Sequence, residues 1–317
     1  MKALTYQRYG TPDVLSWADA EQPAPGPQDV LLRVRAAALN HADLFILSGT
    51  PRIARLAFGM RRPKATILGR DVAGTVEAVG AEVTRFRPGD EVFGEVEQRG
   101  FAEYVTAPAA HLVAKPAAVS FADAATLPVA ATTALQAARL ARLGPGRSVL
   151  INGASGGVGT FAVQIARSLG ATVTGVCSTR NAGLARELGA ERVIDYTRED
   201  LTAIPDRFDA IIDLAGSHGL RAMRRLLTPR GVYVASTGNG GPLLGPLPRL
   251  LGVVLGGSRL RVLATKRDVD DLALLAGMVE QGEVTPVIER TYPLAEGAAA
   301  LWHLEREHAR GKIVLTP

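Results

Sequence analysis

The most constraining feature of the sequence is a glycine-rich loop set between an apolar run at 149–151 and a segment with helical apolar spacing at 158–169. The loop reads Gly153, Ala154, Ser155, Gly156, Gly157, Val158 and Gly159. Glycines here permit a tight turn, close approach of backbone amides to a pyrophosphate, and close packing of the helix on its strand. A glycine-rich turn without a ligand is the alternative. Because a second strand follows the helix, we predict a dinucleotide-binding loop.

Around this loop, strand-like and helical segments alternate. The predicted strands are 148–152, 172–177, 192–195, 210–214, 232–236 and 260–263. Such βαβ repetition is typical of a doubly wound parallel sheet, so the expected fold class is α/β. A single helix is predicted at 121–142, and a last strand at 312–315 can return to the first part of the chain.

The first third of the chain has a different pattern. Short alternating runs at 30–36, 74–79, 91–96 and 104–106 are separated by Pro-Gly or Gly-Pro pairs, as in a small β-rich domain. A length of 317 residues suffices for two domains, each with its own core. We therefore expect one β-rich domain and one doubly wound domain.

The end of the second predicted strand indicates which dinucleotide is bound. An acidic residue there would bind the adenosine ribose and repel a 2′-phosphate. The chain instead has Ser178, Thr179 and Arg180, whose hydroxyls and guanidinium suit a phosphate dianion. The alternative, that Ser178 and Asn181 cap the next helix while Arg180 is solvated, is compatible with phosphate binding. We predict NADPH as the cofactor, with Tyr196 either flanking the adenine or packing in the core.

Composition argues against several other classes of protein. A single cysteine, Cys177, allows no disulfide framework and no zinc site of several thiolates. The net charge of +5 comes with short basic clusters, at 61–64 and 221–225, that lack interleaved aromatics. This favours a solvated surface or a small anionic ligand over nucleic acid. The N-terminal residues lack the apolar core of a signal peptide, so we expect a cytoplasmic protein. Prolines and an arginine interrupt the most apolar stretch, 243–255, so no membrane partner is predicted.

Four further segments, together with the glycine loop, resemble one protein family. The segments are GRDVAGTVEAVG at 69–80, FRPGDEVFG at 86–94, GFAEYV at 100–105, LPVAATTALQA at 127–137 and GASGGVGTFAVQIARSLGA at 153–171. Taken in this order they resemble the medium-chain dehydrogenase/reductase superfamily, in its zinc-independent, quinone-oxidoreductase-like (zeta-crystallin-like) branch. The resemblance spans essentially the whole chain.

The resemblance implies a domain division and a reaction. It implies a GroES-like catalytic domain formed by residues 1–119 and the returning segment 265–317, a Rossmann NADP-binding domain at 120–264, and an active site between them. It also implies a homodimer that transfers hydride from NADPH to a quinone or an α,β-unsaturated carbonyl compound. An alcohol dehydrogenase, an acyl-thioester enoyl reductase, and an NADPH-binding sensor or structural protein with little turnover are the alternatives.

Zinc ligands of the family are missing from this sequence. Zinc-dependent relatives resemble the chain near residues 40–43 and 69–71, where they offer a cysteine and a His-Glu pair. This chain has Asn40, Arg70 and Asp71 there, and its five histidines show no ligand spacing such as HxxxH. We therefore predict no metal site.

Without a Lewis acid, the protein has to align a nicotinamide with its acceptor and exclude water. Asn40 is the first candidate to hydrogen-bond a substrate carbonyl or the cofactor, and the alternative is a loop asparagine that satisfies its own turn. His41 is a candidate proton donor, as is solvent. Thr133 resembles the nicotinamide-contacting threonine of the family, and the alternative is a hydroxyl bonded back to a helical carbonyl. Many members carry a tyrosine five residues after the asparagine, where this chain has Phe45.

Three later segments are further candidates. Loops after the fourth and fifth strands, including Gly238 and Asn239, are expected on the nicotinamide side of the cofactor. The apolar segment 242–255 is a lid, a substrate wall or an oligomer contact. Arg310 and Lys312 either approach the active site or, as we expect, are solvated beside a strand end.

Overall fold

Residues 1–236, 244–307 and 309–317 are described by a computed structural model, in which the chain forms two units. Unit 1 comprises Met1–Thr132, Arg267–Gly282 and Pro286–Pro317, and unit 2 comprises Thr133–Lys266 and Glu283–Thr285. The first boundary therefore lies after Thr132 instead of near residue 120. The reason is that helix α3 (Phe121–Ala125) packs against strands β3 (Asp29–Ala38) and β4 (Asp71–Val79) of unit 1.

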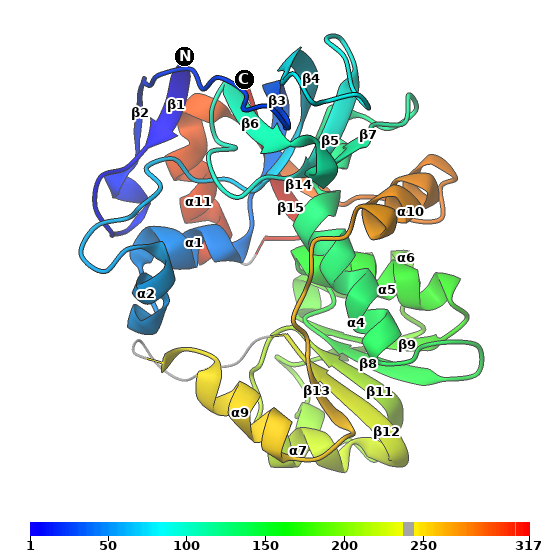
Figure 1. Ribbon diagram of the computed structural model, residues 1–317. Coiled ribbons are helices and arrows are strands. Elements are labelled where there is room, and N and C mark those ends of the chain that lie inside the picture. Colours follow the sequence, from blue (N-terminus) through cyan, green and yellow to red (C-terminus); the bar gives the residue numbers. More distant parts are fainter. Residues whose placement is uncertain (237–243, 308) are drawn as a thin grey trace. The chain divides into compact units, whose positions relative to one another are not determined.

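Unit 2 is built on a parallel sheet of six strands in the order β10-β9-β8-β11-β12-β13 (Figure 1). Counted from β8 this order is 3-2-1-4-5-6, which is the doubly wound order of dinucleotide-binding domains. The strands are β8 (Ser148–Asn152), β9 (Thr172–Cys177), β10 (Arg192–Asp195), β11 (Phe208–Asp213), β12 (Leu227–Ala235) and β13 (Leu260–Val262). The first three have the predicted bounds. β12 begins earlier than predicted because Leu227 pairs with Phe208 before a register shift.

Helix α4 (Thr132–Leu140) precedes β8. The helices that connect successive strands of the sheet are α5 (Gly157–Ser168), α6 (Ala182–Glu187), α7 (Leu220–Arg225) and α9 (Leu247–Leu255). The single helix predicted at 121–142 is interrupted, since a π-helical segment, Leu127–Ala131, separates α3 from α4. Pro128 lies in this segment and has no amide hydrogen to donate, which explains why regular α-helical bonding does not continue through it.

Unit 1 is β-rich, as predicted. Its main sheet has the order β14-β15-β3-β4-β5-β7, with β6 paired to β3, and β1 and β2 form a separate hairpin sheet. The remaining strands are β1 (Lys2–Thr5), β2 (Ser16–Asp19), β5 (Glu91–Glu95), β6 (Tyr104–Pro108), β7 (Leu112–Ala114), β14 (Ile288–Pro293) and β15 (Lys312–Thr316). The helices of unit 1, besides α3, are α1 (His41–Ser48), α2 (Arg55–Phe58), α10 (Val269–Glu280) and α11 (Gly297–Arg306).

The register of unit 1 brings together residues that are far apart in the sequence. Val314 of β15 lies opposite Ala38 of β3, and Ala38 lies opposite Asp71 of β4. The last strand therefore returns to the first part of the chain, as predicted. Because β3 leads directly into α1, the start of that helix lies close to the first residues of both β4 and β15. Among the described residues, every helix is too short or too polar to cross a membrane.

Candidate cofactor and active-site residues

The glycine loop of unit 2 follows β8 and leads into α5. Gly153 has a φ of +95°, and its amide, with that of Ala154, donates to the carbonyl oxygen of Val176 at 3.1 and 3.0 Å. A Cβ atom on Gly159 would lie 2.0 Å from the Gly153 carbonyl oxygen, so only glycine allows this approach of helix to turn. Gly156 precedes α5 without a side chain that could cap it. The amides of the first helical turn are therefore suited to a pyrophosphate.

The segment after β9 contacts this loop. Asn181 is 3% exposed and its Nδ2 donates to the Ser155 hydroxyl at 3.0 Å, while its Oδ1 has no hydrogen-bond partner among the described residues. A buried amide oxygen of this kind can accept a hydrogen bond from a ligand hydroxyl. Neither Ser178 nor Asn181 caps the following helical segment through its side chain, contrary to the capping alternative. Tyr196 is 53% exposed, which excludes the alternative that it packs in the core.

An acidic residue lies beside this segment, and sequence reasoning missed it. Asp195, the last residue of β10, pairs in register with Cys177 and accepts a hydrogen bond from the Thr179 hydroxyl at 2.5 Å. The bonds from Thr179 and Thr197 hold the pKa of Asp195 below its usual value. The prediction considered only the end of β9, whereas parallel pairing brings the neighbouring strand end to the same place. A carboxylate therefore lies next to the predicted 2′-phosphate contacts.

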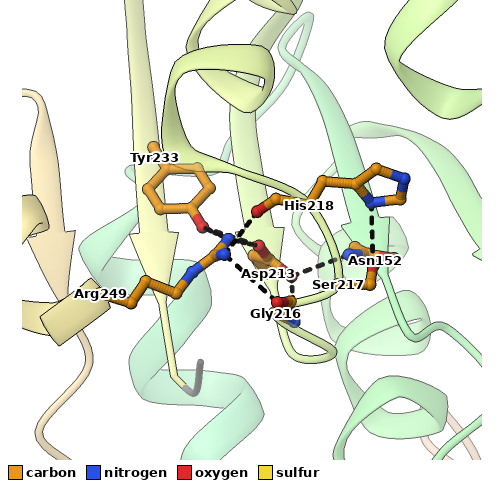
Figure 2. A network of polar contacts seen from close by, with 7 residues as sticks. All are labelled: Asn152, Asp213, Gly216, Ser217, His218, Tyr233 and Arg249. Carbon is orange, nitrogen blue, oxygen red and sulfur yellow. Dashed lines mark hydrogen bonds and ion pairs between the residues drawn. The ribbon is translucent and has the colours of Figure 1, made fainter. Parts of the chain in front are cut away.

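A second network orders the loop after β11 (Figure 2). Asp213 is fully buried, and its Oδ1 accepts from Asn152 Nδ2 and from the Gly216 amide, both at 2.8 Å. Its Oδ2 accepts from the Tyr233 hydroxyl at 2.7 Å and from the Arg249 guanidinium of α9 at 2.5 Å. Burial and the neighbouring carboxylate raise the pKa of Tyr233.

Arg249 also fixes the path of the loop. Its guanidinium donates to the carbonyl oxygens of Gly216 at 3.2 Å and His218 at 2.5 Å (Figure 2). This loop lies next to the glycine loop, since a Cβ atom on Gly153 would be 3.5 Å from the Leu214 Cβ. In the sequence, Arg249 is a lone arginine within an apolar stretch. Because a buried charge needs a partner, this position could have indicated an ion pair.

In unit 1, Asn40 is held inside a charged cluster. Its Oδ1 accepts from Lys312 Nζ at 2.6 Å, its Nδ2 donates to Asp71 Oδ2 at 2.9 Å, and its amide donates to Asp43 Oδ2 at 2.8 Å. Asn40 is 8% exposed, and one hydrogen of its Nδ2 is left after the bond to Asp71. The Asn40 side chain therefore binds residues outside its own turn, contrary to the alternative that it only satisfies that turn.

Lys312 was expected to be solvated, and the structure shows otherwise. Its side chain is 2% exposed, and Nζ also donates to the Leu39 carbonyl oxygen at 2.7 Å and lies 3.6 Å from Asp71 Oδ2. Burial lowers the pKa of Lys312. Burial also raises the pKa of Asp71 to about 7 and that of Asp43 to about 6, and one oxygen of each carboxyl has no partner among the described residues. The cluster therefore holds one ammonium group against two buried carboxyls.

The other sequence candidates lie in several places. His41 is exposed at the start of α1, and Phe45 of the same helix is 53% exposed. Thr133 is 8% exposed, and its hydroxyl lies 3.3 Å from that of Thr265. Gly238 and Asn239 lie outside the described residues. Within the described part of the chain, no three His, Cys, Asp or Glu side chains gather as metal ligands would.

Comparisons with known proteins identify the family. Residues 26–117 match the model of the alcohol dehydrogenase GroES-like domain, and residues 188–315 match that of the zinc-binding dehydrogenase. The NADPH-dependent alkenal/one oxidoreductase of Arabidopsis thaliana is 33% identical, with 100% of this chain and 80% of the relative covered. The chain belongs to the medium-chain dehydrogenase/reductase superfamily, in its quinone-oxidoreductase-like branch. The predicted GroES-like and Rossmann folds are confirmed, and the protein is an oxidoreductase.

Two further similarities fit this branch of the superfamily. Quinone-oxidoreductase QR1 of Triphysaria versicolor is 31% identical, with 100% of this chain and 98% of the relative covered. The solved structure of the quinone oxidoreductase from Coxiella burnetii superposes with a TM-score of 0.89 at 32% identity, covering 100% of this chain and 99% of the other. The model described as a zinc-binding dehydrogenase matches residues 188–315, and Asn40, Arg70 and Asp71, which stand where the resemblance places the zinc ligands of other family members, lie outside that range.

Proposed function

We propose that this oxidoreductase is a zinc-independent reductase that uses NADPH to reduce quinones or α,β-unsaturated carbonyl compounds. The glycine loop carries the proposal, because Gly153 and Gly159 allow a backbone geometry suited to a pyrophosphate. The printed names of similar proteins, an alkenal/one oxidoreductase and two quinone oxidoreductases, support this substrate class.

The residues of unit 2 fit a nicotinamide dinucleotide. The free Oδ1 of Asn181 beside the glycine loop supplies an acceptor for a ligand hydroxyl. Ser178, Thr179 and Arg180 are proposed to hold the 2′-phosphate, and Tyr196 is proposed to flank the adenine. When bound, the nicotinamide supplies the hydride. The remaining proposed contacts are the loop residues 153–159 together with Gly238 and Asn239.

Asp195 opposes the 2′-phosphate and therefore limits the preference for NADPH. Its charge is partly compensated by hydrogen bonds from Thr179 and Thr197, and Arg198 lies 3.8 Å away. Arg180 adds a permanent positive charge to the segment that carries the proposed phosphate contacts. We propose that NADPH is preferred because the guanidinium and hydroxyls outweigh a carboxylate that is already hydrogen-bonded.

In unit 1, the cluster around Asn40 is proposed to present one N–H to the substrate. An asparagine amide can flip by 180°, and here Lys312 on the oxygen and Asp71 on the nitrogen select a single orientation. Lys312 is thus a positioning residue, and the second hydrogen of Nδ2 is the donor proposed for an acceptor carbonyl. His41 is the proposed proton donor and Thr133 the proposed nicotinamide contact.

The proposed function is tested by NADPH oxidation in chelator-treated protein, with a panel of quinones and enones and with NADH in parallel. Turnover with NADPH that exceeds turnover with NADH, and that persists without metal, is the expected result. Tight NADPH binding with no turnover across the panel would contradict the reductase and favour a sensor. Full loss of turnover on chelation, restored by zinc, would favour a metal-dependent alcohol dehydrogenase.

The assembly and the location of the protein are also proposals. A homodimer rests on the family resemblance, and sedimentation velocity measures it directly. A cytoplasmic location is likewise proposed, and fractionation of cells that produce the protein tests it.

A further inference from the structure

One surface segment of unit 1 is basic and has no acidic residue. Residues 44–69 contain five Lys and Arg residues and no Asp or Glu. The sequence leaves two interpretations of the basic cluster at 61–64, a solvated surface and a small anionic ligand. In the structure Arg61, Arg62 and Lys64 are exposed, and none of them pairs with an acidic side chain in the described part of the chain. Cations without an acidic neighbour produce a local positive field that attracts an anion.

Large apolar side chains are exposed on the same segment. Leu56 and Met60 are 66% and 61% exposed, and Ile53 and Phe58 are 38% exposed each. Phe45 of α1, where many family members have a tyrosine, is also exposed. Single exposed apolar residues are common on protein surfaces, but a group of them in one segment indicates a ligand or a contact surface.

Contacts within unit 1 fix the shape of this segment. The Tyr9 hydroxyl donates to the Gly59 carbonyl oxygen at 2.6 Å, and the Arg55 guanidinium lies 4.5 Å from the centre of the Tyr9 ring. Gly59 has a φ of +120°, and a Cβ atom there would lie 2.0 Å from the Arg62 carbonyl oxygen, so only glycine allows this turn. The turn therefore holds the cations at 61–64 next to the apolar side chains of α2.

The segment follows the residue that presents the proposed carbonyl donor. Asn40 is the N-cap of α1, and the eight residues of that helix span about 12 Å. At the other end of α1, Arg55 Nε donates to the Gly49 carbonyl oxygen at 2.9 Å, which ties α2 to α1 (Figure 1). A carbonyl donor, apolar side chains and cations therefore follow one another from Asn40 to Lys64.

We propose that residues 45–64, here called the α1–α2 arm, bind the far end of an acceptor that carries an alkyl chain with an anionic group. In this arrangement the Asn40 amide binds the unsaturated carbonyl, and the apolar side chains of the arm cover the alkyl chain. The cations at 61–64 bind a terminal carboxylate or phosphate. The inference rests on the proposed reductase function and narrows its substrates to anionic, amphiphilic enals and enones.

A small amphiphile fits the arm better than a larger occupant does. A two-fold contact with a second copy of the chain, centred on the arm, would bring the cations at 61–64 against one another. A bilayer is usually met by a longer amphipathic helix, whereas α2 has only four residues. The arm continues directly from Asn40 along α1, which favours an acceptor of the reaction for which Asn40 is the proposed donor.

The test compares kcat/KM, with NADPH as the donor, for acceptors of equal chain length and different charge. They are a medium-chain enal that ends in a carboxylate, the same enal ending in a phosphate monoester, and the methyl ester of the carboxylate. We expect both anions to be reduced roughly tenfold more efficiently than the ester, with a smaller difference at high salt. The anion with the larger value identifies the end group.

Two variants separate the charge of the arm from its apolar side chains. Arg61→Gln/Arg62→Gln/Lys64→Gln should raise KM for the anions until they are reduced no better than the ester. Leu56→Ser/Met60→Ser should lower kcat/KM for all three long acceptors on the order of tenfold relative to methyl vinyl ketone, which has no chain to bind.

The matched control removes three exposed charges of unit 2, in Arg221→Gln/Arg224→Gln/Arg225→Gln, and should keep the preference of the parent for the anions. Thermal melting establishes that all variants fold. An ester reduced as well as both anions would overturn the inference, as would a 61/62/64 variant that behaves like the control. In either case, reduction of methyl vinyl ketone with NADPH would still support the proposed function, so the two failures are distinguishable.

Two other results would give the arm a different occupant and overturn the inference. Co-sedimentation of the parent with anionic vesicles, together with equal values for the anions and the ester, would assign the arm to a membrane surface. A dimer in sedimentation velocity that Leu56→Ser/Met60→Ser dissociates would assign it to a subunit contact.

Discussion

Replacing Lys312 by methionine tests the buried cluster of unit 1 most directly. The substitution keeps the side chain's length but removes an ammonium group that lies 2.7 Å from the Leu39 oxygen, 2.6 Å from Asn40 Oδ1 and 3.6 Å from Asp71 Oδ2. Removing one partner of a buried ion pair costs roughly 3–5 kcal/mol, since the other charge stays buried without compensation. We expect a loss of that size in the free energy of unfolding of unit 1 at pH 8.

The loss should depend on pH in a definite direction. Burial raises the pKa of Asp71 to about 7 in the folded protein, against about 3.9 in an unfolded chain. The folded state therefore binds more protons between these values, so the stability that Asp71 contributes is complete below about pH 4 and is lost as pH rises towards 7. Without Lys312, which lowers this pKa, the decline should extend above pH 7. The cost of Lys312→Met should accordingly be smaller at pH 5.5 than at pH 8.

Tryptophan fluorescence during urea unfolding is the assay, because Trp17 and Trp302 both belong to unit 1 and are the only tryptophans of the chain. The exposed Lys64→Met serves as the control and should change stability by less than about 0.5 kcal/mol. The double variant Lys312→Met/Asp71→Asn should regain most of the lost free energy of unfolding, and the difference in cost between pH 5.5 and pH 8 should disappear, because asparagine does not titrate. A cost below about 1 kcal/mol at pH 8, or an equal cost at both pH values, would refute the reasoning.

Three further predictions concern unit 2. Arg180→Glu should weaken NADPH binding at least about 30-fold more than NADH binding, measured by titration calorimetry, and equal losses would rule out the 2′-phosphate contact. Asp195→Asn should strengthen NADPH binding about threefold to tenfold by removing a neighbouring like charge, with no gain for NADH; a gain for both cofactors would place Asp195 away from the phosphate. Gly159→Ala should weaken both cofactors and lower the melting temperature, because the new methyl group would lie 2.0 Å from the Gly153 carbonyl oxygen, and unchanged binding would show that the loop adapts.

The parallel sheet of unit 2 was predictable because its signals are local. β8, β9 and β10 have the bounds that their apolar runs predict. The glycine loop is recognisable because a tight turn requires the residue types found there. The interruption at Pro128 was missed, because the alanine-rich residues on either side read as one helix. A periodic pattern therefore predicts which segments are helices or strands, but it does not predict where a helix is interrupted.

Contacts set by strand register could not be predicted. Asp195 reaches Thr179 only because β10 pairs with β9 so that their last residues align. Lys312 reaches Asn40 across 272 residues of sequence because β15 pairs with β3, and the pairing of β3 with β4 brings Asp71 to the same place. A lysine at the start of a strand is usually solvated, so the local sequence did not predict that Lys312 is buried.

Each unit contains a buried aspartate, and the two differ in how many hydrogen bonds and cations compensate the carboxyl group. Both oxygens of Asp213 accept two hydrogen bonds each, including those from Tyr233 and Arg249, so the carboxylate is fully compensated and anchors α9. Asp71 shares the ammonium of Lys312 with a second carboxyl, and one of its oxygens has no partner among the described residues. Burial of an undercompensated carboxylate raises its pKa, as it does for Asp71. Asp71 should therefore make the stability of unit 1 depend on pH between about pH 4 and 7, and both tryptophans report the unfolding of that unit.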